Sequence, residues 1–244
     1  WREGQDGESE EAFASRCAQD LDDMIQSEGP ETVAAFIAEP VMGAGGVVVP
    51  PATYWEKIQA VLAKYDILLI ADEVICGFGR TGNMFGSTTF DIKPDILTMS
   101  KQITSSYFPF SAFMINDRVY QPIADESGRI GVLGHGYTGG GHPVGAAVAL
   151  ENIKIIEERD LVANAAERGA ELQAGLTDLT SHPLVGEARG IGLIGALELI
   201  APEGKSGDFA PGKLGAQMNA IMLRNGLISR NMTDAMAFCP PLIV

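Results

Sequence analysis

Two residues whose side chains could share one chemical task each follow a short apolar segment. Asp72 comes directly after the apolar residues 67–71, and Lys101 follows the apolar residues 96–99. Because ligands of an open α/β sheet bind outside the carboxyl ends of its strands, a carboxylate and an amine placed there could face one small molecule. The pair predicts pyridoxal phosphate chemistry, in which the lysine forms a Schiff base and the carboxylate keeps the pyridinium nitrogen protonated.

Both residues also have an ordinary structural explanation. An aspartate at a strand end, such as Asp72, often only caps a turn, and a lysine after a strand, such as Lys101, is usually solvated. Position alone leaves both explanations open. The surrounding sequence must therefore decide between them.

The apolar pattern predicts alternating helices and strands that would position the pair. Helical spacing of apolar residues is found at 8–28 and 51–64. Short apolar runs typical of buried strands are found at 33–38, 67–71, 96–99 and 112–115. Strands joined through helices by short connections pair in parallel, so we expect an α/β fold with a mostly parallel central sheet.

The second half of the chain changes character. Helices are predicted at 142–159, 161–179 and 212–225, a strand pair at 186–200 and a polar loop at 201–211. We expect a domain boundary near residue 158. Residues 1–158 would then belong to a large domain and residues 159–244 to a smaller α+β domain that is truncated at its end.

Composition excludes several classes of protein. The 244 residues are 46% apolar, enough for a sizeable core, and carry a net charge of −15, which argues against a nucleic-acid partner. The apolar runs are too short to span a membrane. Three cysteines at irregular spacing predict neither disulfides nor a metal cluster, and they favour a reducing cytoplasm.

Other chemical motifs are weaker. Two glycine sets match the dinucleotide pattern G-x-G-x-x-G, one within residues 134–139 and one within residues 190–195, but neither lies between a predicted strand and helix. His135 and His142 stand in a glycine-rich loop without a carboxylate at the spacing of a catalytic triad or metal site, so we interpret both as structural. Arg80 is expected to stabilise its glycine-rich loop through hydrogen bonds.

Residues 71–82, with the sequence ADEVICGFGRTG, resemble a segment of the class III aminotransferases. The resemblance begins at residues 36–47, includes Lys101, and continues through 136–145 and 189–195 to 239–242. Within that family the chain is most similar to the omega-aminotransferase branch that uses pyruvate as amino acceptor. The resemblance implies fold type I, with helices on both faces of the central sheet, and pyridoxal 5'-phosphate as cofactor.

The resemblance also implies roles for individual residues near the cofactor. Lys101 would form the Schiff base and later carry the proton between the substrate and the cofactor. Asp72 would pair with the pyridine nitrogen, and Val74 would pack against one face of the ring. Thr138 would bind the phosphate from the partner subunit, which implies a homodimer with shared active sites, although Gly139 and the glycine after it replace the tyrosine and serine common in this branch.

Substrate recognition is implied by two further residues. Arg230 stands at the spacing from Cys239 at which this family places a mobile arginine that binds the carboxylate of the keto acid. Glu39 matches the resting partner of that arginine. Ile75 replaces a glutamine of other class III branches, which fits the omega branch.

The sequence therefore predicts an aminotransferase that moves an amino group from an amine or omega-amino acid to pyruvate. Two alternatives stay open. One is a class III relative with a decarboxylase or aminomutase outcome. The other is an inactive fragment or an assembly-only subunit, since the chain reads as an internal fragment that lacks an N-terminal part and the extreme C-terminus, and the resemblance places the phosphate cradle and a stacking aromatic residue upstream of Trp1.

Overall fold

The computed structural model describes residues 4–202 and 209–244, and the chain forms two compact units. Unit 1 contains the chain up to Pro40 together with Pro50–Phe78 and Phe85–Arg159. Unit 2 contains Val41–Val49, Gly79–Met84 and the chain from Asp160 onward. Two short loops of the first half thus belong to unit 2, and the assignment of these parts to a large and a small domain remains a prediction.

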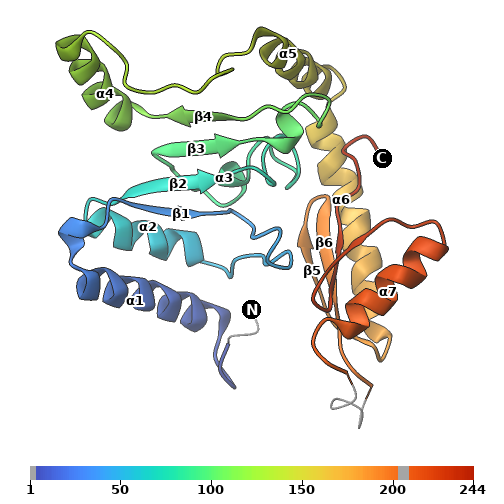
Figure 1. Cartoon of the computed structure of the whole chain (residues 1–244). Helices are drawn as coiled ribbons and strands as arrows, with labels where there is room; N and C mark the ends of the chain where they lie inside the picture. Colours follow the sequence, from blue (N-terminus) through green and yellow to red (C-terminus); the bar gives the residue numbers. More distant parts are fainter. Residues whose placement is uncertain (1–3, 203–208) are drawn as a thin grey trace. The chain divides into compact units, whose positions relative to one another are not determined.

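Unit 1 is built on a four-stranded sheet of the order β1-β2-β3-β4 (Figure 1). The strands are β1 (Ala35–Ala38), β2 (Leu68–Asp72), β3 (Ile96–Met99) and β4 (Ala112–Ile115). The first three strands pair in parallel, and β4 runs antiparallel to β3. The predicted α/β class and the mostly parallel sheet are therefore confirmed.

Two amphipathic helices, α1 (Glu10–Glu28) and α2 (Tyr54–Lys64), pack against each other, and α2 lies between α1 and the sheet (Figure 1). Helix α1 begins where Ser9 accepts a hydrogen bond from the backbone N of Ala12, which satisfies one of the free N–H groups of the first turn. Ile25 of α1 and Ile58 of α2 are almost fully buried in one cluster with Leu69 of β2. The apolar faces predicted at 8–28 and 51–64 are thus the faces that build this core.

Helix α4 (Asp117–Ile130) was not expected from the sequence. It contains Pro122, which normally disfavours a helix interior, and none of its residues is buried. The helix begins where Asn116 accepts a hydrogen bond from Val119 N. Pro122 argues against a helix over this segment in the sequence, although the apolar residues of the segment recur at helical spacing. An extended segment then leads to α5 (Pro143–Glu158).

Short helical turns complete unit 1 and one connection of unit 2. They are η1 (Pro30–Thr32), α3 (Gly86–Thr89), η2 (Lys101–Ile103) and η3 (Leu179–Ser181). No helix in the described ranges, 4–202 and 209–244, has the length and apolar content needed to cross a membrane.

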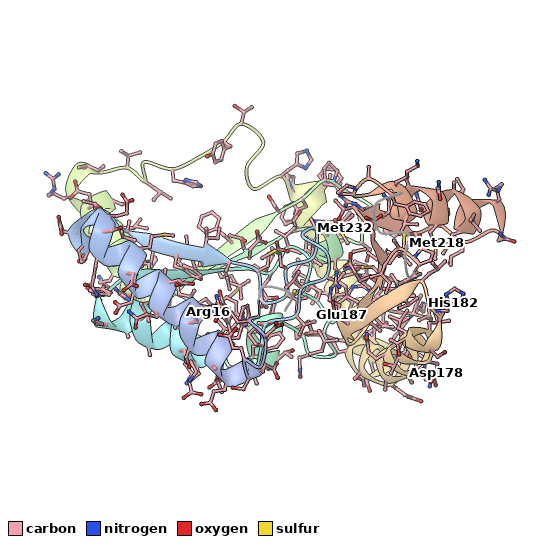
Figure 2. All side chains as sticks on the ribbon, turned by 90° about the horizontal axis from the view of Figure 1, so that it is seen from below. Arg16, Asp178, His182, Glu187, Met218 and Met232 are labelled. Carbon is pink, nitrogen blue, oxygen red and sulfur yellow. The ribbon has the colours of Figure 1, made fainter. Side chains whose placement is uncertain are left out.

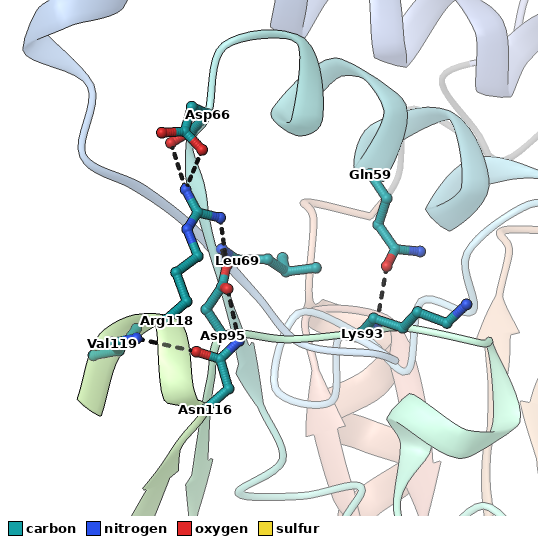
Figure 3. A network of polar contacts seen from close by, with 8 residues as sticks. All are labelled: Gln59, Asp66, Leu69, Lys93, Asp95, Asn116, Arg118 and Val119. Carbon is teal, nitrogen blue, oxygen red and sulfur yellow. Dashed lines mark hydrogen bonds and ion pairs between the residues drawn. The ribbon is translucent and has the colours of Figure 1, made fainter. Parts of the chain in front are cut away.

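A polar network at Asp95 connects the amino-terminal ends of β2 and β3 with the end of β4 (Figure 3). One carboxylate oxygen of Asp95 accepts from Leu69 N at 2.9 Å, and the other accepts from Asn116 Nδ2 at 2.8 Å. Arg118 Nη1 lies 3.5 Å from Asp95, and its Nη2 donates to Asp66 Oδ1 at 2.6 Å. Asp95 therefore connects three strands to the first turn of α4.

Unit 2 contains a second four-stranded sheet with the order β5-β6-β8-β7, antiparallel throughout. Its elements are α6 (Leu161–Asp178), β5 (Val185–Ile191), β6 (Ile194–Leu199), α7 (Lys213–Arg224), β7 (Arg230–Met232) and β8 (Ala235–Phe238). Asp178 and His182 mark the turn from α6 toward β5 in Figure 2. The expected strand pair at 186–200 is confirmed, whereas residues 203–208 of the expected polar loop lie outside the described residues.

Helix α6 approaches the β5–β6 hairpin closely at Gly169. A Cβ atom added to Gly169 would lie 2.5 Å from the backbone carbon of Gly192. Beside this contact, Gln173 Nε2 donates to Gly192 O at 2.9 Å, and Leu193 is buried against Ala165. The absence of a side chain at Gly169 is thus what lets the helix reach the hairpin.

This contact predicts opposite effects for two substitutions on the same helix. Gly169→Ala should lower the free energy of unfolding by about 1 kcal/mol or more, because overpacking against backbone costs about 1–3 kcal/mol and exceeds the gain in helix propensity. Gly175→Ala, where nothing lies within 4 Å of the added Cβ, should raise it by about 0.5–1 kcal/mol. Urea unfolding of both variants tests this, and equal midpoints would contradict it.

Candidate active site

The parallel pairing of β2 and β3 brings Asp72 and Lys101 to the same edge of the sheet. Asp72 is the last residue of β2 and pairs with Thr98 of β3. Lys101 follows the end of β3 and begins the turn η2. The two residues that the sequence singles out therefore follow neighbouring strand ends.

The carboxylate of Asp72 is half-buried and only partly engaged. Its Oδ1 accepts a hydrogen bond from Val74 N at 3.0 Å. No hydrogen bond or ion pair joins Oδ2 to any residue in the described part of the chain. Asp72 thus caps its own turn, as the ordinary explanation expects, and also keeps one oxygen for a ligand.

The next residue, Glu73, fixes this turn and was not recognised from the sequence. Its side chain is fully buried and accepts hydrogen bonds from Gly86 N at 2.9 Å, Ser87 N at 2.6 Å and Ser87 Oγ at 2.5 Å. Its backbone N donates to Thr98 O at 2.9 Å. Glu73 therefore ties the strand end to the loop that follows, and the sequence signal for it was an acidic residue directly after an apolar strand.

Lys101 presents an exposed amine. Within residues 4–202 and 209–244, its Nζ forms no hydrogen bond or ion pair. The backbone at Lys101 has a φ of 43°, in the left-handed region that residues other than glycine rarely adopt. The amine is accordingly available for a ligand, and the turn that carries it is strained.

Val74 and Thr138 occupy different surroundings within unit 1. Val74 is half-buried in the turn after Asp72. Thr138 lies in the segment 131–142 that joins α4 to α5, all of whose residues are exposed (Figure 1). Among the described residues no hydrogen bond joins Thr138 to Asp72 or Lys101. One copy of the chain therefore does not bond Thr138 to the strand-end pair.

Glu39 and Arg230 belong to different compact units. Glu39 follows β1 in unit 1 and is half-buried. Arg230 is the first residue of β7 in unit 2 and is exposed. Their pairing remains a prediction.

The two histidines of the glycine-rich loop contact aromatic rings. His135 makes edge contacts with the rings of Phe113 and Tyr137, and His142 packs against Phe108. Within residues 4–202 and 209–244, no group of histidine, cysteine and carboxylate side chains has the arrangement of a metal site.

The loop that contains Arg80 and the glycines at 190–195 have structural roles in unit 2. Arg80 donates from Nη1 to the carbonyl oxygens of Leu193 at 2.8 Å and Pro240 at 2.6 Å, so the expected hydrogen bonds of Arg80 are confirmed, with backbone acceptors. The glycines at 190–195 form the β5–β6 hairpin, and those at 134–139 lie in the exposed segment. Neither set has the strand, turn and helix of a dinucleotide site.

Comparison with known proteins gives a consistent family. The sequence model of the family described as Aminotransferase class-III matches residues 3–244. The chain is 49% identical to a diaminobutyrate–2-oxoglutarate transaminase of Halomonas elongata over 98% of this chain and 52% of that protein. It is 48% identical to gamma aminobutyrate transaminase 1, mitochondrial, of Solanum lycopersicum, over 100% of this chain and 48% of that protein.

Solved structures agree. A structure described as a transaminase with L-ala has a TM-score of 0.96 and 67% identity, covering 100% of this chain and 57% of that one. The omega transaminase from Pseudomonas jessenii in complex with PMP has a TM-score of 0.93 and 60% identity, covering 98% of this chain and 53% of that one. The chain thus spans about half the length of the curated relatives it matches. With its α/β sheet and a family match over nearly all of its residues, the chain belongs to the class III aminotransferases, a family of pyridoxal phosphate-dependent enzymes of fold type I.

Proposed function

We propose that the protein is an aminotransferase that moves an amino group from an amine or omega-amino acid to pyruvate, with pyridoxal phosphate as cofactor. The observation that carries this proposal is the position of Asp72 and Lys101 after neighbouring parallel strand ends. A carboxylate and an amine at that edge could face a single ligand.

The groups at this edge fit the cofactor. Asp72 Oδ2, which none of the described residues occupies, can accept a hydrogen bond from a protonated ring nitrogen, while the Val74 bond at 3.0 Å holds the other oxygen. The exposed amine of Lys101 can reach an aldehyde. When bound, pyridoxal phosphate supplies that aldehyde for covalent attachment and an electron-poor ring that stabilises negative charge on the substrate carbon.

Four residues of the chain would then have separate roles in the reaction. Lys101 would accept a proton at Nζ from the amine-bearing carbon of the substrate and would deliver it to the C4′ carbon of the cofactor. To accept the proton, the lysine amine must be neutral. Asp72 would hold the positive charge of the ring nitrogen through a charge-assisted hydrogen bond. Val74 would pack against one face of the ring, and Glu73 would keep the Asp72 turn from moving as charge develops.

The exposed segment that carries Thr138 supports a homodimer with shared sites. Its large apolar residues are strongly exposed in one chain, with Tyr137 at 82%, Val132 at 61% and Leu133 at 57%. Large apolar side chains exposed close together in this way are typical of an interface. In the proposed dimer, Thr138 would contribute its hydroxyl to the phosphate of the partner's cofactor.

The choice of pyruvate is supported by two observations. Arg230 is exposed and could bind a keto-acid carboxylate with two parallel hydrogen bonds, exchanging with Glu39 as its resting partner. The similar structure described with L-ala holds the amino acid that pyruvate becomes when it accepts an amino group. The curated names of the relatives, which refer to gamma aminobutyrate and diaminobutyrate, support an amine or omega-amino donor. A cytoplasmic location remains a prediction.

Loss of the lysine amine provides the first test. Lys101→Ala should abolish covalent cofactor attachment and lower amino transfer at least about 10²-fold, because proton transfer by a positioned group contributes on that scale. Absorbance of the lysine-bound cofactor and turnover with an amine and pyruvate measure both effects. Lys93→Ala, another exposed lysine of unit 1, serves as the matched control and should retain both signals. Retained transfer in Lys101→Ala would exclude the proposed role.

Removal of the arginine tests the acceptor. Arg230→Ala should raise the KM for pyruvate by about tenfold to a hundredfold, since a charged hydrogen bond contributes about 1.5–3 kcal/mol, and should leave the KM of an amine donor that has no carboxylate nearly unchanged. Steady-state kinetics with both substrates measures the difference. Arg224→Ala, at the end of α7, is the matched control. An equal effect on both substrates would contradict carboxylate recognition by Arg230.

Product analysis separates transamination from the alternatives. With alanine as donor and a simple aldehyde as acceptor, we expect one pyruvate released for each new amine formed. Carbon dioxide release without pyruvate would indicate a decarboxylase, and an amino group that moves within one molecule would indicate an aminomutase. Absence of saturable cofactor binding would instead favour the inactive or assembly-only explanation.

A further inference from the structure

The turn that carries Lys101 has an unusual backbone. Lys101, Ser105 and Ser106 have φ angles of 43°, 48° and 63°, all in the left-handed region. This region is disfavoured for residues with a Cβ atom because of steric contact with the backbone. Such a conformation persists only where the surrounding structure fixes it, and it is common at functional sites.

Asn152 of α5 bonds to this turn from about fifty residues away in the sequence. Its Nδ2 donates to Gln102 O at 2.7 Å and to Ile103 O at 3.3 Å. Its Oδ1 accepts from Ser105 Oγ at 2.8 Å, and the same hydroxyl accepts from Gln102 Nε2 at 2.7 Å. The Asn152 amide therefore bonds to the two backbone carbonyls that directly follow Lys101. It also bonds to the side chain of Ser105, whose backbone is in the left-handed region.

The helix that carries Asn152 is itself anchored. Ala149 and Ile156 lie on the same face of α5 as Asn152, at helical spacing, and are 5% and 1% exposed. Gly145, one turn earlier, packs so closely that an added Cβ would lie 2.6 Å from the ring of Phe110. Asn152 therefore extends from a fixed support to the strained turn.

We propose that Asn152 is a positioning residue for Lys101: its amide holds the turn from Lys101 to Ser106 in the one backbone conformation from which the lysine amine serves the strand-end site. The proposal rests on the proposed function, because it gives Lys101 the role of cofactor attachment. Asn152 acts through the turn and touches no reacting atom.

An isosteric substitution separates positioning from packing. Asn152→Asp keeps the volume but places an oxygen against the carbonyl oxygens of Gln102 and Ile103, whereas Asn152→Ala removes the group altogether. If Asn152 only fills space, the aspartate variant should be the milder one. If the donated hydrogen bonds hold the turn, the aspartate variant should be the more harmful.

The measurement follows attachment at Lys101 directly instead of turnover. Pyridoxal phosphate is added to the complete protein, the lysine amine condenses with its aldehyde and releases water, and borohydride reduces the C=N bond to a stable C–N bond. Peptide mass spectrometry gives the ratio of label at Lys101 to label at the exposed Lys93. We expect this ratio to fall at least about tenfold in Asn152→Asp, as loss of two hydrogen bonds predicts, and less in Asn152→Ala.

Asn164 of α6 provides a matched control. Its Nδ2 also donates to two backbone carbonyls, those of Leu242 at 2.7 Å and Val244 at 2.9 Å, but it lies in unit 2. Asn164→Asp should lower the melting temperature and leave the labelling ratio unchanged. An equal fall of the ratio in Asn164→Asp and Asn152→Asp would overturn the proposal in favour of general destabilisation.

The remaining outcomes are also decisive. Label absent from Lys101 in the unaltered protein would refute the proposed function itself. Label present there with an unchanged ratio in folded Asn152→Asp would refute only the positioning role. Should Asn152→Asp fail to fold, Ser105→Ala removes the hydroxyl bond to Asn152 Oδ1 at 2.8 Å, and its ratio must fall if the proposal is right.

Discussion

The candidate site depends on the parallel register in which Asp72 of β2 pairs with Thr98 of β3. A register shift of one residue would turn every side chain of β2 to the opposite face and would remove the carboxylate from the edge that follows β3. The backbone of Glu73 continues this pairing through its bond to Thr98 O at 2.9 Å. The positions of Asp72 and Lys101 at one edge of the sheet are therefore set by backbone hydrogen bonds that do not depend on either functional side chain.

Polar side chains support the register at both ends of the strands. At the amino-terminal end, Asp95 accepts from Leu69 N at 2.9 Å, which joins the start of β3 to β2. At the carboxyl end, the buried carboxylate of Glu73 takes three hydrogen bonds from the Gly86–Ser87 backbone and hydroxyl. Burying a carboxylate is costly unless its hydrogen bonds are satisfied, and here they are satisfied by groups of the loop that it fixes.

The candidate site combines residues on turns that hydrogen bonds fix with a residue on an exposed segment. Asp72 is held by its own turn, and Lys101 stands on a strained turn that α5 supports through Asn152. By contrast, Thr138 lies in a wholly exposed segment of unit 1. In our proposal, the fixed groups perform the proton chemistry and the exposed segment serves a second copy.

The sequence by itself determined the parts of the structure that depend on local periodicity: the amphipathic α1 and α2, the short apolar strands, and the two strand-end residues Asp72 and Lys101. It did not determine strand burial, since β1 and β4, predicted as buried strands, contain no buried residue. It did not reveal α4, whose interior Pro122 argues against a helix, or the short strands β7 and β8. Only the tertiary structure showed that Glu73 and Asn152 support the candidate site, because their partners lie 13 or more and about 50 residues away. Hydrogen bonds over such separations leave no periodic signal in the sequence, since they form only after the sheet and helices have packed.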